Sequence, residues 1–136
     1  MAKLTAEMQA TLAACHPVVF ATASADGQPN CNYVGVHKLI DDETMYLSDQ
    51  FFLKTKANLL ANPKVAVIFM GEAGAFTIHG TATYIDEGEQ FEELKAWANG
   101  VLVAMGKPAC AKGGAIVHID AVYNTSSGPN AGKQLI

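Results

Sequence analysis

The chain has 136 residues, of which 50% are hydrophobic and 16% are charged; this suits one domain with a buried core and excludes a disordered or fibrous protein. Its nine basic residues are all lysine and its net charge is −4. This mild acidity argues against a basic surface of the kind that binds nucleic acids or acidic membranes. No apolar run is long enough to span a bilayer, and Glu7 and Gln9 interrupt any signal-peptide core, so we expect a cytoplasmic protein with no nucleic-acid or membrane partner.

The N-terminal half of the sequence predicts one helix and three strands. The helix covers residues 4–14, with Thr5 as its N-cap and with Met8 and Leu12 on one face. The strands cover residues 18–24, 29–40 and 44–48, where β-branched and aromatic residues are frequent. The A-D-G-Q run at 25–28 is a strong hairpin signal, so the first two strands should pair with each other.

The C-terminal half predicts two more helices and three more strands. We expect helices over residues 54–61 and from residue 87 onward, and strands over residues 64–70, 75–85 and 115–123. Asn62 should end the first of these helices, because a residue that precedes a proline is pushed out of the α region. Gly80 marks a bulge in its strand. The D-E-G-E run at 86–89 has the form of a capping box that opens the last helix.

These elements indicate a mainly β fold, an antiparallel six-stranded barrel with helices packed on its outside. Closure of a sheet into a barrel removes the exposed edges that short strands would otherwise leave. The sequence contains no glycine-rich nucleotide fingerprint, and its strands do not alternate with long helices, which excludes a Rossmann unit. No repeat or change of composition divides the chain, so we expect residues 1–136 to form a single domain.

The start of the helix at 54–61 carries an unusual charge. Lys54 and Lys56 lie where the helix macrodipole is positive and lysine is disfavoured. Together with Thr55 and the free backbone N–H groups of a helix start, they form a setting that attracts an anion such as a phosphate. Two simpler interpretations stay open: both lysines are solvated surface residues, and Thr55 is only an N-cap.

Several motifs follow one another in an order that is typical of one protein family. They are V-V-F-A-T-A-S-A-D-G-Q-P-N, Y-V-G-V-H-K, Y-L-S-D, K-T-K-A-N-L-L-A-N-P-K-V-A-V-I-F and H-G-T-A. Over roughly residues 17–86 the sequence resembles the pyridoxamine 5′-phosphate oxidase-like family of FMN-binding split barrels, and in size it is most similar to the small bacterial FMN-binding proteins. The resemblance implies a homodimer with FMN held at the interface between the two subunits.

The resemblance also implies which residues bind the phosphate and the ribityl chain of FMN. Lys54, Thr55 and Lys56 match the segment that binds the phosphate. Ser48 and Asp49 match positions near the ribityl chain or the flavin ring. Apart from the resemblance, Ser48 and Asp49 are more readily interpreted as a cap or turn pair.

The ring end of the site is implied by the second predicted strand. Asn32, Tyr33, Val34 and Gly35 match positions whose backbone lies along the edge of the isoalloxazine ring. A polar residue such as Asn32 in a largely apolar strand needs a hydrogen-bond partner, and backbone or water can supply that partner as well as a ligand can.

The missing arginine limits the reaction that the resemblance implies. Family members that oxidise pyridoxamine phosphate use arginine for the phosphates of substrate and FMN, so we do not expect that reaction here, whereas lysine still binds a phosphate as a point charge.

The function that we expect is that of a small FMN-dependent oxidoreductase or an electron carrier, whose redox partner is a small molecule or another protein. The flavin carries the chemistry, so no catalytic side chain is assigned. The alternative is a non-catalytic barrel that binds haem or another small ligand.

The remaining candidate residues carry less information. Four scattered histidines and three separated cysteines show no metal-binding spacing, so no metal site is expected, and the cysteines fit a reducing compartment. His37 lies in a strand and either is structural or lines a pocket. Trp97 interrupts the polar half of its helix, and it either packs against the barrel or covers a ligand or a subunit interface.

Overall fold

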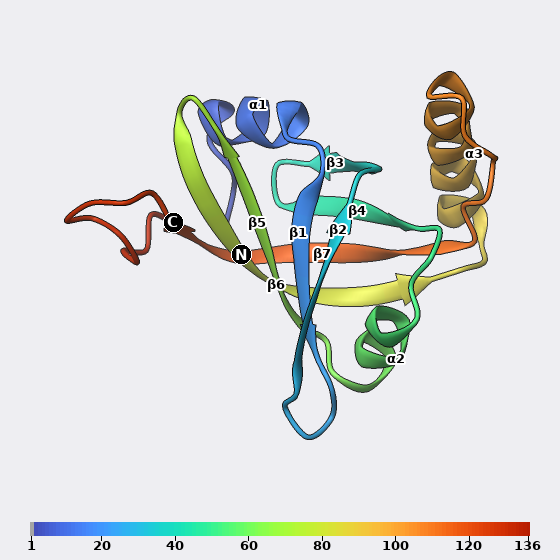
Figure 1. The fold of residues 1–136 in the computed structure, drawn as a ribbon, viewed down its shortest axis with the longest axis horizontal. Coiled ribbons are helices and arrows are strands. Elements are labelled where there is room, and N and C mark those ends of the chain that lie inside the picture. Colours follow the sequence, from blue (N-terminus) through green and yellow to red (C-terminus); the bar gives the residue numbers. More distant parts are fainter. Residues whose placement is uncertain (1) are drawn as a thin grey trace.

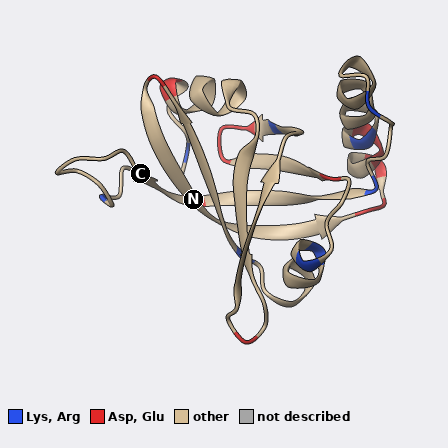
Figure 2. Cartoon of the chain, in the orientation of Figure 1, with Lys and Arg blue, Asp and Glu red and all other residues tan. Residues whose placement is uncertain are grey.

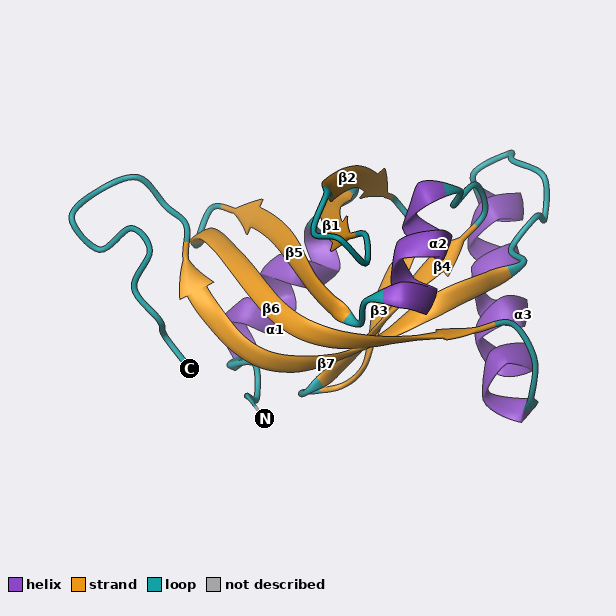
Figure 3. Cartoon of the chain, turned by 90° about the horizontal axis from the view of Figure 1, so that it is seen from below, coloured by secondary structure: helices purple, strands orange, loops and turns teal. Residues whose placement is uncertain are grey.

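Seven strands form one antiparallel sheet that curls into a half-barrel, with three helices packed around it (Figures 1 and 3). The structure is a computed structural model and describes residues 2–136. In chain order the elements are α1 (Ala6–Ala14), β1 (Val18–Ala23), β2 (Pro29–Val34), β3 (His37–Asp41), β4 (Thr44–Asp49), α2 (Lys54–Ala61), β5 (Lys64–Gly71), β6 (Gly74–Ile85), α3 (Glu89–Ala104) and β7 (Gly113–Asn124). Leu12 of α1 and Leu59 of α2 reach the core inside the curl, and α3 packs on the outer face. The predicted mainly β, antiparallel fold is confirmed, and the predicted count of six strands is one too low.

The extra strand comes from a break at Gly35 and Val36. The segment 29–40, predicted as one strand, is divided there into β2 and β3. The order of strands in the sheet is β2-β1-β5-β6-β7-β4-β3, so these two consecutive strands lie at opposite edges. Two residues can connect opposite edges only because the sheet curls until its edges approach each other. At this crossing the backbone N–H of Ser48 donates to the carbonyl oxygen of Val36 at 2.9 Å.

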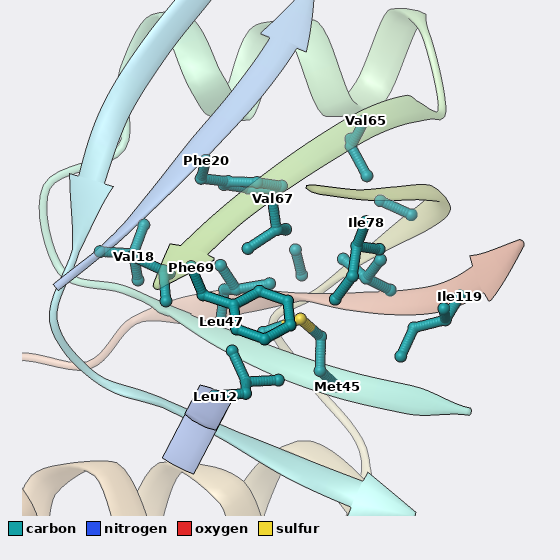
Figure 4. Close-up of a cluster of buried hydrophobic side chains, with 14 of the residues drawn as sticks. Leu12, Val18, Phe20, Met45, Leu47, Val65, Val67, Phe69, Ile78 and Ile119 are labelled. Carbon is teal, nitrogen blue, oxygen red and sulfur yellow. The ribbon is translucent and has the colours of Figure 1, made fainter. Parts of the chain in front are cut away.

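The core lies inside the curl of the sheet (Figure 4). Alternate residues of a strand point inward, as Val18 and Phe20 do in β1. Every residue of β4 is buried, because its two faces pack against different groups. Met45 and Leu47 belong to the barrel core, whereas Tyr46 packs on the other face with apolar residues of α3. The amphipathic helix α3 therefore covers the outer face of β4.

The N-cap predicted for α1 is confirmed, whereas the one predicted for α3 is not. Thr5 caps α1, since its hydroxyl accepts the backbone N–H of Met8 at 3.2 Å, which confirms the prediction. The capping box predicted at 86–89 is wrong, because α3 begins after Gly88 and no side chain of the described residues caps it. The φ of Gly88 is 98°, a left-handed conformation that favours glycine, so the backbone itself makes the turn into the helix.

The bulge predicted at Gly80 is confirmed. The register between β6 and β7 shifts between His79 and Gly80. A Cβ atom at Gly80 would lie 2.7 Å from the carbonyl oxygen of His118, so only glycine fits this close approach of two strands.

Within residues 2–136 none of the helices has the length and hydropathy needed to cross a membrane.

Candidate functional site

A groove of about 350 Å³ lies where the link between β2 and β3 meets the loop that joins β4 to α2. One wall comes from the end of β2 and the following link, a second from the end of β4 and its loop, and a third from the last turn of α3 and the residues after it. The lining residues are Asn32, Tyr33, Val34, Gly35, Val36, Ser48, Gln50, Phe51, Phe52, Leu102, Met105 and Lys107. Five of the residues predicted to bind a cofactor, namely Asn32, Tyr33, Val34, Gly35 and Ser48, therefore meet in one groove.

Two buried oxygen atoms of this groove have no hydrogen-bond partner among residues 2–136. Ser48 is 2% exposed, and its hydroxyl makes no hydrogen bond to any described residue. The side-chain oxygen of Gln50 is likewise buried and unpaired among residues 2–136. Because buried polar groups are nearly always satisfied, these two atoms indicate a polar ligand in the groove.

The N-terminus of α2 lies beside the groove and carries the two lysines (Figure 2). Leu53 precedes the helix, and no side chain among residues 2–136 caps its first N–H groups. Lys54 is exposed, while the ammonium of Lys56 lies 5.0 Å from the ring centroid of Tyr84. The first turn therefore presents unsatisfied N–H groups and two cations to an approaching anion.

Thr55 connects this helix start to the groove. Its side chain is buried, and its hydroxyl donates to Oδ1 of Asn32 in β2 at 2.8 Å. The amide of Asn30 donates to the same hydroxyl at 3.4 Å. Thr55 is therefore not the N-cap of α2, and Asn32 has the protein partner that its place in the strand requires. The pair Asn32–Thr55 holds the phosphate end and the ring end of the predicted site together.

Asp49 lies behind the groove and does not line it. Its carboxylate is fully buried and accepts the backbone N–H of Phe52 at 2.8 Å and the phenol of Tyr84 at 2.6 Å. Burial, together with the bond to Asp49, raises the pKa of Tyr84 well above its usual value, so this phenol stays protonated. Asp49 thus holds the turn that leads from β4 into α2.

The rest of the groove was not predicted from the sequence. The lining residues that escaped prediction are Val36, Gln50, Phe51, Phe52, Leu102, Met105 and Lys107. The F-F-L run at 51–53 is an available signal, because adjacent apolar residues in a loop mark a surface that another group covers. Leu102 and Met105 offer no local signal, since only the packing of α3 brings them to the groove. Within the part of the chain that the structure describes, no three His, Cys, Asp or Glu side chains are placed to hold a metal ion.

Comparison with known proteins shows a matching family and a relative of similar sequence. The family model described as pyridoxamine 5′-phosphate oxidase matches residues 4–123. An uncharacterized protein of Methanocaldococcus jannaschii is 38% identical over 135 residues, which are 96% of this chain and 87% of that protein.

Several solved structures are similar in fold to this chain. HupZ of Group A Streptococcus is 29% identical, with a TM-score of 0.77 over 95% of this chain and 99% of that one. An FMN-binding protein of Syntrophomonas wolfei is 17% identical, with a TM-score of 0.72 over 88% of this chain and 84% of that one. HutZ, the heme storage protein of Vibrio cholerae, is 15% identical, with a TM-score of 0.68 over 90% of this chain and 95% of that one. The latter two identities are low and show a shared fold alone.

The family model spans most of the chain and the archaeal relative aligns with nearly all of it, so this protein belongs to the pyridoxamine 5′-phosphate oxidase family.

Proposed function

We propose that this protein is an FMN-binding flavoprotein that works as a homodimer, either as a small oxidoreductase or as an electron carrier. The observation that carries the proposal is the connection of two features by the Asn32–Thr55 hydrogen bond. One feature is the groove with the buried, unpaired hydroxyl of Ser48, and the other is the uncapped, lysine-bearing start of α2. FMN has a polar-edged ring at one end and a phosphate at the other, so it matches both.

The phosphate end of this fit rests on α2. A phosphate bound at its N-terminus accepts backbone N–H groups and is attracted by the helix macrodipole. Lys54 and Lys56 add two positive charges close to that position. Lysine binds phosphate as a flexible point charge, so the absence of arginine does not weaken this part of the proposal.

The ring end of the fit rests on the groove. Val34, Val36 and Leu102 give it apolar walls for a flat ring, while Ser48 and Gln50 contribute the unpaired oxygens. The Ser48 hydroxyl both donates and accepts hydrogen bonds, which suits the carbonyls and ring nitrogens of a flavin edge. When bound, FMN supplies electron or hydride transfer, and the residues of this chain bind and orient it.

The rim of the groove supports the homodimer. Tyr33, Phe51 and Leu53 are 76%, 85% and 82% exposed, although all three are large and apolar. Apolar groups clustered around a ligand groove favour a protein partner that covers them. A second copy of the chain is the partner we propose, and it would close the open side of the groove over the ligand.

The oxidation of pyridoxamine phosphate is not part of the proposal. The chain contains no arginine, since its nine basic residues are all lysine, and Lys107 is the one lysine in the lining of the groove. The named neighbours differ in ligand, with FMN in one name and heme in another, so the cofactor has to be measured directly.

The test is an absorption spectrum of the purified protein, followed by titration with FMN and by gel filtration. We expect flavin bands, or their appearance after addition of FMN, at one FMN per chain in a particle of twice the chain mass. Anaerobic reduction with NADH and with NADPH then separates an oxidoreductase from a carrier that needs another donor. A colourless protein that does not take up FMN would overturn the proposal, and a Soret band would replace it with haem binding.

A further inference from the structure

A second and larger cavity lies between the end of α1, the β2–β3 link with β3, and α3. Its volume is about 720 Å³, within the roughly 300–1,000 Å³ that is typical of small-molecule sites. In Figure 1, α1 and α3 stand on either side of β3. Most of the lining is apolar, and it includes the aromatic ring of Trp97. Such a cavity suits the body of a flat, largely apolar molecule.

This cavity adjoins the groove described above. Gly35, Val36, Met105 and Lys107 line both spaces. A molecule in the larger cavity therefore lies next to whatever occupies the groove, and the two ligands share a wall instead of competing for one place.

His37 gives the cavity a polar group that no described residue of the protein satisfies. It is 3% exposed, and its Nε2 lies 2.7 Å from the carbonyl oxygen of Cys15, which accepts hydrogen bonds only. Nε2 therefore carries the proton, and in the neutral ring Nδ1 is an acceptor. Nδ1 is buried and has no partner within residues 2–136. Burial lowers the pKa of His37, which favours this neutral ring. A ligand that brings a hydroxyl or an N–H group would satisfy it.

The charge around the cavity is positive. Lys38 and Lys107 line it, and none of its lining residues is acidic. The ammonium of Lys38 lies 4.8 Å from the ring centroid of Trp97, so a cation and an aromatic wall occur together. His16 stacks on His37, and its two ring nitrogens lie 2.8 and 2.9 Å from the carbonyl oxygens of Gly35 and Ala13, so these nitrogens already have partners in the protein. The two lysines favour an anion.

We propose that this cavity binds a flat aromatic organic anion that carries a hydroxyl or N–H donor. The anionic group lies near Lys38 and Lys107, the ring system lies against Trp97 and the apolar lining, and the donor meets Nδ1 of His37. The role of this ligand rests on the proposed flavoprotein function: with FMN in the groove, the ligand in the cavity is the small molecule that is held beside the flavin.

The test uses two fluorescent probes that differ by one charge. The probe 1-anilinonaphthalene-8-sulfonate has an aromatic body, an N–H donor and a sulfonate, and N-phenyl-1-naphthylamine is its neutral counterpart. We expect one sulfonate probe to bind per chain, and the neutral probe to bind about tenfold more weakly because it lacks the charge-assisted contacts. Equal affinity of the two probes would overturn the proposed anion preference.

Variants assign the binding to the cavity. Lys38→Gln combined with Lys107→Gln should lower the affinity for the sulfonate probe about tenfold and leave the neutral probe within about twofold. Lys3→Gln combined with Lys133→Gln removes the same charge elsewhere and should change neither. Ala13→Trp fills the cavity from α1 and should abolish binding of both probes, whereas Ala10→Trp, on the same helix and away from the cavity lining, should not. Binding that survives Ala13→Trp in a folded protein would place the probes elsewhere and overturn the proposal.

The same titrations with and without FMN separate this inference from the flavoprotein proposal. Probe binding that follows the variants in a protein that takes up no FMN supports the cavity and removes only the flavin. FMN uptake by a protein that does not distinguish the two probes overturns the cavity and leaves the flavoprotein proposal standing. With both correct, the sulfonate probe binds to the FMN-loaded protein and perturbs the flavin spectrum.

Discussion

The phenol of Tyr84 donates a hydrogen bond of 2.6 Å to the buried carboxylate of Asp49, and this bond joins the end of β6 to the turn that leads into α2. The other carboxylate oxygen accepts the backbone N–H of Phe52. Both oxygens of Asp49 are therefore used to position residues 50–53, whose side chains line and border the groove. The bond from Tyr84 therefore stabilises the buried carboxylate and, through it, holds the turn that borders the groove.

Replacing Tyr84 by Phe should destabilise the protein. The substitution leaves a buried carboxylate with one donor fewer, so the free energy of unfolding should fall by about 1–3 kcal/mol in urea denaturation. Tyr33→Phe is the matched control, because Tyr33 is 76% exposed, and its effect should stay within about 0.5 kcal/mol. Equal effects of the two substitutions would show that the Asp49 contact contributes little.

The same bond should appear in the pH dependence of stability. The pKa of Tyr84 is raised in the folded protein, first by burial and then by Asp49, so the folded state keeps a proton that the unfolded state releases at about pH 10. Unfolding is then favoured as the pH rises above about 10, and stability falls. The free energy of unfolding should fall less steeply above this pH in Tyr84→Phe than in the native protein, and an identical slope would contradict the assignment.

Reversing the two charges at the start of α2 should weaken FMN binding far more than folding. Lys54→Glu combined with Lys56→Glu removes two charge-assisted contacts and adds repulsion, so the Kd for FMN should rise by about 100-fold or more. Riboflavin, which lacks the phosphate, is the control ligand, and its Kd should change little. A variant that folds normally and still prefers FMN to riboflavin would show that the phosphate binds elsewhere.

Two glycine substitutions should change stability in opposite directions. Gly114 in β7 lies opposite Ser48 of β4, and a Cβ atom there would come within 2.7 Å of the carbonyl oxygen of Leu47 and would also overlap the Tyr46 ring. Gly114→Ala should therefore cost about 1–3 kcal/mol. Gly100 lies inside α3, and a Cβ atom added there would meet open space, with nothing within 4 Å. Gly100→Ala should stabilise the protein by up to about 1 kcal/mol in the same urea measurements.

The protein should lose stability in mild acid because of His37. Burial, with a smaller effect of the neighbouring His16, lowers the pKa of His37 in the folded state. The unfolded chain takes up this proton at about pH 6.5, whereas the folded chain takes it up only at lower pH. The unfolded state then binds more protons, so the free energy of unfolding should fall as the pH drops below about 6.5.

Variants assign this acid dependence to one residue. The His37 ring contacts His16 and the Cys15 carbonyl, and the charged groups that line the same cavity are Lys38 and Lys107. His37→Gln should flatten the decline of stability between about pH 7 and pH 5. His118→Gln, at an exposed position, should leave the decline unchanged. A decline that persists in His37→Gln would assign it to another group.

Local patterns were sufficient for most elements and failed where the chain had to cross the barrel. The helix over residues 4–14 and the bulge at Gly80 follow from capping, periodicity and the space for a side chain, which neighbouring residues determine. The break at Gly35 was missed, because Y-V-G-V-H is as compatible with a continuous strand as with two. The capping box was wrong, because the left-handed conformation of Gly88 moved the helix start.

The sequence by itself determined the mainly β class, the motif order that is typical of the family, and two lysines at a helix start. These depend on residues that are adjacent or a few positions apart. The tertiary structure alone decided that Thr55 meets Asn32 across 23 positions, that Tyr84 meets Asp49 across 35, and that the Ser48 hydroxyl is left buried without a partner among the described residues. It also decided that a large apolar cavity lies beside the groove. The physical reason is that the curl of the sheet brings together strand ends and loops that are far apart in the chain, and no local preference records that closure.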